Sequence, residues 1–425
     1  DAGTSLENEL TLFPSDILAR HAWKQGGRLD LFADIERSAE AIGDFAGSNA
    51  ARGYLAFCAR SQEIYRTLKP SFIAAERPSP FDLVRRVGFS NLGALIRTAP
   101  MKTMWAALGE YFKDPRLRQL FGRYATYTGC SPFQAPATLM LVAHVEQDGI
   151  WQVKGGMRRI AEAMQNVAER QGATFRCGAH VAEITIDRGR AAGVVLENGE
   201  RFEADAIVFN GDASALGLGL LTDAARSAAE PVAERDRSLS AITWCLKTKT
   251  SGFPLEHHNV FFAKDYREEF DAIFRRRTIC DSPTVYICAQ SQARDHLLVL
   301  INAPAGLRDG ALDMQAIERR TFGLLKSCGL SAEPEGAAIT TPAMFEALFP
   351  GSDGALYGRA NHGAFTSFQR PGACSRLPGL YLAGGSVHPG AGIPMATMSG
   401  RLAAARLLED LVTTGQARSR STVRR

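Results

Sequence analysis

Glycine and proline are concentrated in one segment near the C-terminus whose pattern could hold a phosphate or a flat polar ring. The run from Leu380 to Gly400, LYLAGGSVHPGAGIPMATMSG, predicts an apolar strand, a glycine turn and the start of a helix. Such a turn presents free backbone N–H groups beside the positive end of a helix. We predict that Gly384 and Gly385 approach a phosphate. The residues expected to face a ring are Gly390, Gly392, Ile393, Pro394 and Met395. The alternative is a glycine-rich loop that only turns the chain.

A second candidate region lies in the middle of the chain. The turn from Lys154 to Met157 opens a helix, and strands follow at Val181 and in AIVFNGDAS, residues 206–214. This order of helix, strand, meander and strand is typical of a nucleotide-binding half, in which the backbone at Val181 would meet an adenine. Asn210, Gly211 and Asp212, which end the last strand, are further candidates. The alternative is an ordinary α/β packing unit.

Few titratable residues are placed to act on a substrate. His362 and Arg359 precede the glycine-rich segment and are candidates for contacting a substrate hydroxyl or a cofactor ring, and His388 lies within the segment. For each, the alternative is a structural hydrogen bond. No HExxH motif is present, and the adjacent His257 and His258 are not expected to place both rings on one strand face. We therefore predict no metal site.

Composition excludes several classes of protein. The 425 residues are 45% hydrophobic and 22% charged, with a formal net charge of +4, which fits a folded globular chain and gives little support to a nucleic-acid partner. The eight cysteines are scattered, as in a reducing compartment. Two uncharged stretches, residues 124–145 and 377–400, contain glycines and prolines that would break a membrane-spanning helix.

The remaining pattern suggests how the chain is organised. Apolar spacing predicts a mostly helical part from about Ser15 to Val145, interrupted at Pro100. Within it, Met101, Met104 and Trp105, flanked by Arg97 and Lys102, form either part of the core or a helix resting on a bilayer.

The rest of the chain alternates helices and strands. A helix from about Gly155 to Gly172 is followed by the strands TFRC, HVAEITID, AAGVVLE and RFE, with a hairpin at Asn198–Gly199. Four more strands, AITWCLKTK, NVFF, TVYICAQ and HLLVLINAP, predict an antiparallel sheet, and a helix at Leu312 to Cys328 precedes a loop-rich passage. The last residues, 414–425, are expected to form a mobile basic tail.

With these motifs in place, the chain resembles the phytoene-desaturase-like carotenoid desaturases, within the FAD-dependent amine-oxidase-like superfamily. The segments that carry the resemblance are DAGTSL, DGIWQVKGGM and YLAGGSVHPGAGIPMATMSG. The segments HHNVFFAKDYREEF, SPTVYICAQ, INAPAG and ALYGRANHGAFTSFQRP are similar to the branch that desaturates 1-hydroxy- or 1-methoxycarotenoids at the 3,4 position. Two segments depart from the family pattern. The common opening D-S/T-G-P reads Asp1, Ala2, Gly3, Thr4 here, and the acidic residue that many members place after the last strand is Gly385.

The resemblance implies an α/β fold of two domains. The FAD-binding domain would comprise residues 1–12, 150–235 and 350–413, as an incomplete Rossmann-type domain, and residues 13–149 and 236–349 would form a substrate domain with an antiparallel sheet and a helical cap. No strand followed by GxGxxG is present. We therefore expect the first βαβ unit to be missing from the sequence given, and FAD binding to be weak or absent.

The resemblance also implies a reaction and a cellular location. The expected reaction is the loss of a hydride to FAD and of a proton from the neighbouring carbon of an acyclic carotenoid, such as hydroxyneurosporene. The electron acceptor is not specified. A cytoplasmic bacterial protein, peripherally associated with the membrane surface that delivers its substrate, is expected. The alternatives are a phytoene desaturase, another flavin amine-oxidase-like oxidoreductase, or a truncated chain without flavin.

Overall fold

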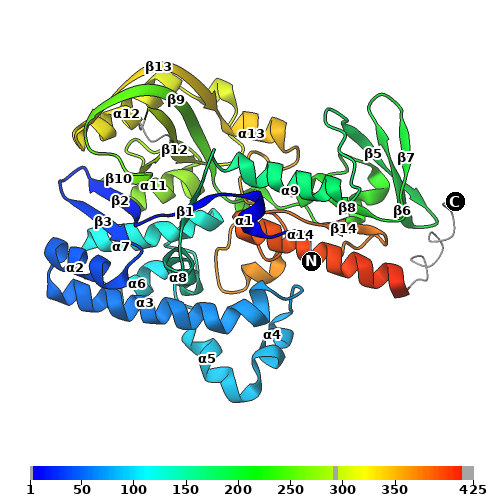
Figure 1. Ribbon diagram of the computed structural model, residues 1–425, viewed down its shortest axis with the longest axis horizontal. Coiled ribbons are helices and arrows are strands. Elements are labelled where there is room, and N and C mark those ends of the chain that lie inside the picture. The colour runs from blue at the N-terminus through cyan, green and yellow to red at the C-terminus, as the bar shows by residue number, and fades with distance from the viewer. Residues whose placement is uncertain (1–2, 291–294, 414–425) are drawn as a thin grey trace.

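A seven-stranded sheet is the largest element of the computed structural model, which describes residues 3–290 and 295–413 (Figure 1). Its strands run in the order β13-β9-β12-β11-β10-β2-β3. Only β10 and β2 pair in parallel, and the other neighbours are antiparallel. The predicted antiparallel sheet is therefore confirmed and extended. The strands are β2 (Ile17–Trp23), β3 (Arg28–Phe32), β9 (Ser240–Gly252), β10 (His258–Phe262), β11 (Val285–Ala289), β12 (His296–Ala303) and β13 (Leu330–Thr340).

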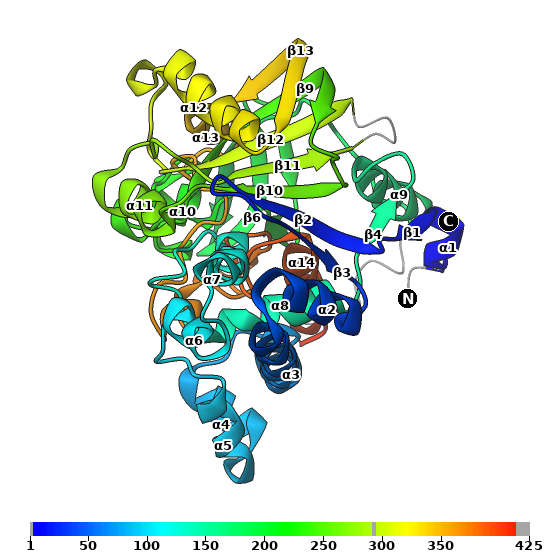
Figure 2. The same ribbon diagram turned by 90° about the vertical axis from the view of Figure 1, so that its left-hand side faces the viewer.

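Helices cover both faces of this sheet. Successive side chains of β10 point to opposite faces, so Val260 and Phe262 pack with one layer of helices and Phe261 packs on the other side. The first layer contains α2 (Ile35–Ala46), α3 (Ser48–Leu68), α6 (Met104–Tyr111), α7 (Pro115–Gly122) and α8 (Leu141–Gln147), and the opposite face carries α12 (Met314–Ser327) (Figure 2).

Two predictions for this part were wrong. Residues 17–32 form the hairpin of β2 and β3 instead of helix. Gly26 and Gly27, with φ of 95° and 101°, turn the chain between two apolar runs, and that pair of glycines was the available signal. The passage after α12 was expected to be irregular, but it contains β13. This strand lacks a run of large apolar residues because it lies at the edge of the sheet, where most of its side chains reach solvent.

A second part of the molecule carries the glycine-rich segment. The strands β8 (Ile207–Phe209) and β14 (Leu380–Leu382) pair in parallel, and α10 (Ala213–Gly217) and α14 (Ile393–Thr413) follow their carboxyl ends. Beside them lie α9 (Arg158–Arg170) and a sheet of β5 (Val181–Asp187), β6 (Arg190–Leu196) and β7 (Arg201–Glu203) (Figure 1).

The local predictions for this part had mixed outcomes. The hairpin at Asn198–Gly199 is confirmed, with Gly199 at a φ of 84° between β6 and β7. The predicted strand at residues 174–177 is wrong. That segment is exposed and pairs with no strand among the described residues, and a strand is stable only when its backbone groups are paired.

A helical lobe, residues 80–101, protrudes from the body of the molecule in both views (Figures 1 and 2). It is formed by α4 (Pro80–Val87) and α5 (Leu92–Arg97), and the chain breaks around Pro100 before α6, as predicted. No helix among the described residues is both long and apolar enough to cross a membrane. The predicted basic tail, residues 414–425, lies outside the described residues.

The remaining helices and strands are short. They are α1 (Leu6–Glu9), β1 (Leu12–Pro14), β4 (Trp151–Val153), α11 (Tyr266–Asp271) and α13 (Pro342–Leu348).

Candidate functional site

A cavity of about 980 Å³ lies between the helical layer, the large sheet and the glycine-rich segment. Its wall is predominantly apolar, and the glycine-rich segment contributes every residue from Pro389 to Met395. Pockets of roughly 300–1,000 Å³ are typical of small-molecule sites, so this cavity lies at the large end of that range. Apolar lining residues include Leu68, Phe72, Ile73, Leu83, Val84, Leu95, Leu139, Val142, Ile150, Val260 and Leu300.

The parallel pair β8 and β14 brings two of the predicted regions together. The Ala383 N–H donates to the Phe209 carbonyl at 3.0 Å, so Asn210 to Asp212 and Gly384 to Gly385 leave neighbouring strands at the same edge. A Cβ at Gly384 would lie 2.9 Å from Asn210 Oδ1, and its φ is 116°. Only glycine fits this position.

The glycine-rich segment also leaves room for a flat group. Added Cβ atoms would meet nothing within 4 Å at Gly385, and at Gly390 and Gly392 the nearest atoms would lie 3.7 and 4.0 Å away. The latter two line the cavity immediately before α14, a helix of 21 residues. Bare backbone at the N-terminus of a long helix is suited to the polar edge or phosphate of a flavin. The residues present therefore fit such a cofactor.

Arg370 holds the glycine turn to the preceding loop. It is 1% exposed, and it donates from Nη1 to the carbonyls of Tyr357 and Gly385, both at 2.9 Å, and from Nη2 to the carbonyl of Arg359 at 2.6 Å. Burial lowers its pKa to about 10. Sequence reasoning missed this residue because one arginine in a predicted loop gives no pattern.

Asp212 is buried beside the same turn. Its carboxylate accepts a hydrogen bond of 2.8 Å from the Ser214 N–H and so caps α10, while Ser386 Oγ accepts from the Ala213 N–H at 3.2 Å. Burial raises the pKa of the Asp212 carboxyl, against the opposing effect of the hydrogen bond from Ser214. These contacts fix the two strand ends relative to each other.

The candidate catalytic residues make structural contacts. His388, 2% exposed, donates from Nε2 to the carbonyls of Phe72 and Ala75 at 2.9 and 3.0 Å, and its buried Nδ1 has no partner in the described part of the chain. His362 Nε2 accepts from the Ser131 N–H at 3.0 Å. Burial lowers the pKa of each histidine to about 4.

Arg359 pairs with Asp236 at 3.0 Å. None of these three candidates is among the residues that line the cavity, although Asn361 and Phe365 beside His362 are. Their proposed roles toward substrate or cofactor stay predictions.

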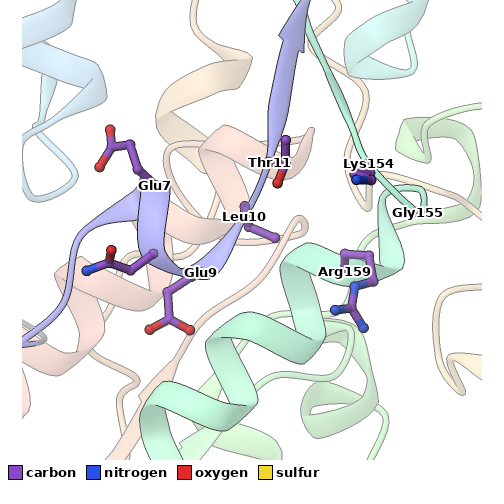
Figure 3. A pocket seen from close by; sticks show the side chains of 8 residues that line it. Glu7, Glu9, Leu10, Thr11, Lys154, Gly155 and Arg159 are labelled. Carbon is purple, nitrogen blue, oxygen red and sulfur yellow. The ribbon is translucent and has the colours of Figure 1, made fainter.

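Val181 and most of the turn from Lys154 to Met157 lie away from this cavity, although Met157 is one of its lining residues. Val181 begins β5 and pairs with Leu196. Lys154, Gly155 and Arg159 form one side of a cleft of about 340 Å³, and Figure 3 shows Glu7 and Glu9 on the other side. The predicted contact of Val181 with an adenine stays a prediction.

The two adjacent histidines lie closer together than the strand-face argument predicted. His257 precedes β10, so the alternation of a strand does not constrain its ring, and the two ring centroids are 4.5 Å apart. His257 donates from Nδ1 to the Ala289 carbonyl at 3.0 Å, and its Nε2 lies 3.7 Å from Cys288 Sγ. Together with His258 these side chains could converge on one ion.

Comparisons with known proteins agree with this geometry. The family model "Flavin containing amine oxidoreductase" matches residues 4–408. Hydroxyneurosporene desaturase of Rubrivivax gelatinosus is 49% identical over 98% of this chain and 82% of its own length. The 1-hydroxycarotenoid 3,4-desaturase of a Flavobacterium species is 33% identical over 69% of this chain and 62% of its own length.

A solved putrescine oxidase variant has the same fold, with a TM-score of 0.55 at 11% identity over 96% of this chain and 84% of its own. The predicted fold class and the predicted resemblance are both confirmed. The chain belongs to the flavin containing amine oxidoreductase family and, within it, groups with hydroxyneurosporene desaturase.

Proposed function

We propose that this protein is an FAD-dependent desaturase that introduces the 3,4 double bond into an acyclic 1-hydroxy- or 1-methoxycarotenoid. The observation that carries the proposal is the large apolar cavity with the glycine-rich segment in its wall. A polyene offers almost no polar handle, so a long apolar lining must position it. The names of the relatives support the same substrate class.

FAD would be held largely by backbone. Gly384 and Gly385 would face its phosphate, and Gly390, Gly392 and the first turn of α14 would face its ring, with Asn210 to Asp212 completing the turn. The predicted division into a flavin-binding domain and a substrate domain is part of this proposal. When bound, FAD supplies the acceptor for the hydride that desaturation removes.

The chain's own side chains contribute by positioning and by excluding water. Phe72, Leu83 and Leu95 present apolar surface to the cavity, and such surface holds the polyene without solvating a developing charge. His388 lies in the glycine-rich segment, but its Nε2 hydrogen is already donated to two carbonyls. It would support the Phe72 region instead of transferring the substrate proton.

We also propose that the helical lobe rests on a membrane. Phe81, Ile96 and Met101 are 68, 70 and 78% exposed, which is unusual for side chains of this size, and Arg85 and Arg97 lie beside them. The same lobe supplies Pro80, Leu83, Val84, Leu95, Thr98 and Pro100 to the cavity wall. A polyene could therefore pass from lipid into the cavity without crossing water.

An anaerobic single-turnover experiment tests the function. The purified protein, supplied with FAD, is mixed with 1-hydroxyneurosporene in vesicles, and absorption spectra are recorded. We expect loss of the oxidised flavin bands together with a shift of the polyene bands to longer wavelength, since conjugation grows by one double bond. Bleaching with an amine such as putrescine, and none with the polyene, would favour the amine-oxidase alternative.

A further inference from the structure

One region of the predominantly apolar cavity carries its charged side chains. Five of its lining residues with hydrogen-bonding side chains come from four separate elements of the chain and meet there, and we call them the polar cluster: Arg123, Tyr127, Glu146, His258 and Tyr286. None belongs to the glycine-rich segment. Burying a polar group costs free energy unless the group is hydrogen-bonded. A polar cluster in an apolar wall therefore indicates a polar partner in the cavity.

Arg123 is the centre of the polar cluster. Its Nη1 donates to the Tyr127 hydroxyl at 2.9 Å, and its guanidinium carbon lies 5.0 Å from the centre of the Tyr286 ring and 5.1 Å from that of Tyr127. The aromatic faces thus stack around the cation and fix its orientation. The Tyr286 hydroxyl, in turn, lies 2.7 Å from His258 Nδ1.

The charge of Arg123 has no direct counter-ion among the described residues. No carboxylate of that part of the chain lies within 4.0 Å of it, and the bond to Tyr127 is its one hydrogen bond there. A guanidinium has five N–H donors in a planar fork. The remaining donors of Arg123 are therefore open to whatever the cavity holds.

Hydrogen-bond acceptors lie beside the remaining N–H donors of Arg123. The Tyr127 hydroxyl donates to Glu146 Oε1 at 3.4 Å, and the Tyr124 hydroxyl donates to Glu146 Oε2. Burial raises the pKa of the Glu146 carboxyl, and hydrogen bonds and the charge of Arg123 oppose that rise. The polar cluster can thus both donate to a ligand oxygen and accept from a ligand hydroxyl.

We propose that the polar cluster binds the terminal oxygen of the carotenoid, with Arg123 donating to it and Tyr127 or Glu146 accepting from a hydroxyl. This assignment rests on the proposed function and adds its specificity-determining residues. A 1-hydroxyl satisfies both kinds of group, a 1-methoxyl satisfies only the donors, and an unsubstituted polyene leaves the charge of Arg123 desolvated and unpaired. The polar cluster therefore selects oxygenated ends over hydrocarbon ends.

The position of the polar cluster suits the bond that reacts. In a 1-hydroxycarotenoid, C3 and C4 are the second and third carbons beyond the one that bears the oxygen, so the anchored end and the reacting bond must share one part of the cavity. Tyr357 and Arg123 both line this cavity. The Tyr357 backbone is joined through Arg370 to the carbonyl of Gly385.

The test compares two polyenes that differ only in the terminal oxygen. Quenching of tryptophan fluorescence gives the dissociation constants of 1-hydroxyneurosporene and neurosporene in detergent micelles. We expect the protein to bind the hydroxylated polyene about 10- to 100-fold more tightly, since hydrogen bonds to a charged group contribute that much. In Arg123→Met the ratio should fall to about 1, while neurosporene binds at least as well as before.

Three further variants define the outcome. Arg123→Lys keeps the charge but loses the fork, and should retain part of the preference. Arg116→Met is the matched control, because Arg116 stacks on Phe45 at 3.9 Å outside the cavity, and its ratio should not change. If Arg123→Met does not fold, Tyr127→Phe should still lower the ratio about three- to tenfold.

The two proposals fail in different ways. A preference for the hydroxylated polyene that survives Arg123→Met, or a protein that desaturates the polyene with no preference at all, would overturn the assignment of the polar cluster alone. A protein that neither binds nor desaturates either polyene would overturn the proposed function itself.

Discussion

Arg370 and Gly385 are joined by a hydrogen bond of 2.9 Å, from Nη1 of the guanidinium to the backbone carbonyl oxygen. The same guanidinium binds the carbonyls of Tyr357 and Arg359, so three backbone segments share one buried cation. The glycine turn carries few side chains that could fix it from within. Its shape is therefore set by a buried arginine that lies behind the cavity wall and is not itself one of the lining residues.

Replacing Arg370 should destabilise the whole fold. Arg370→Met removes the donors and leaves three buried carbonyls unpaired, for an expected loss of about 3–5 kcal/mol in the free energy of unfolding. Denaturant titration of the purified variant measures this loss. Arg376→Met is the matched control. Its ion pair with Glu230 is exposed, so the loss should stay below about 1 kcal/mol, and equal losses in both variants would contradict the role of Arg370.

Side chains at the two cavity glycines should prevent flavin binding. Gly390→Val and Gly392→Val place branched side chains where the ring is proposed to lie, at φ values of 138° and 95°. We expect the flavin content of the purified protein, measured by absorbance, to fall more than about tenfold. Gly178→Val is the control because Gly178 also has a positive φ, 71°, but lies in open space and does not line the cavity. Unchanged flavin content in both cavity variants would refute the proposed ring position.

Acid should destabilise the protein through His388. Its folded-state pKa is lowered to about 4 from the ordinary 6.5 by burial. Between those pH values His388 is protonated in the unfolded chain and neutral in the folded chain. The free energy of unfolding therefore decreases as the pH falls below about 6.5. At pH 5 the cost is about 2 kcal/mol. The difference in unfolding free energy between pH 7.5 and pH 5 should therefore be smaller by that amount in His388→Gln.

The control for this experiment is His180→Gln. The side chain of His180 is 65% exposed, so this variant makes the same exchange of histidine for glutamine outside the core. A His388→Gln variant with the same pH dependence as the unmodified protein would show that His388 is protonated in the fold.

Acidic substitutions in the helical lobe should weaken vesicle binding. Ile96→Asp with Met101→Asp removes apolar contact and repels anionic lipid, so co-sedimentation with vesicles that contain phosphatidylglycerol should fall about 10- to 100-fold. The double variant Met344→Asp with Leu348→Asp alters apolar side chains on α13 that are 45 and 65% exposed, and it should bind as before. Equal losses in both pairs would indicate nonspecific adsorption, and no loss in either would exclude the lobe as the contact.

The segments with strong local patterns could be predicted. An apolar run followed by glycines correctly indicated β14 and its turn, and the helix after Lys154 and the hairpin at Asn198–Gly199 were evident from spacing. The pairing of β8 with β14 was harder to see, since parallel neighbours come from distant parts of the chain. It is this pairing that places Asn210 beside Gly384.

The polar cluster was missed although its ends stand out in the sequence. Arg123 and Glu146 are the charged residues that border the uncharged stretch from 124 to 145, which was considered only as a candidate membrane span. Tyr127 bridges the two in the structure. Two charged residues at the ends of an apolar stretch meet in space only if the chain between them turns back. Those turns depend on packing against β10 and β11.

The parallel contact between β2 and β10 has a consequence for how the chain acquires its structure. Arg20 is paired with Asn259, so the N-terminal hairpin and its sheet neighbour are separated by more than half of the chain. During synthesis the apolar strand β2 leaves the ribosome long before its partner exists, and pairings of such separation close slowly. We therefore expect the sheet to be completed late. Until β10 has been synthesised, the apolar face of the early hairpin would have to be covered by the helices that follow it or by a chaperone.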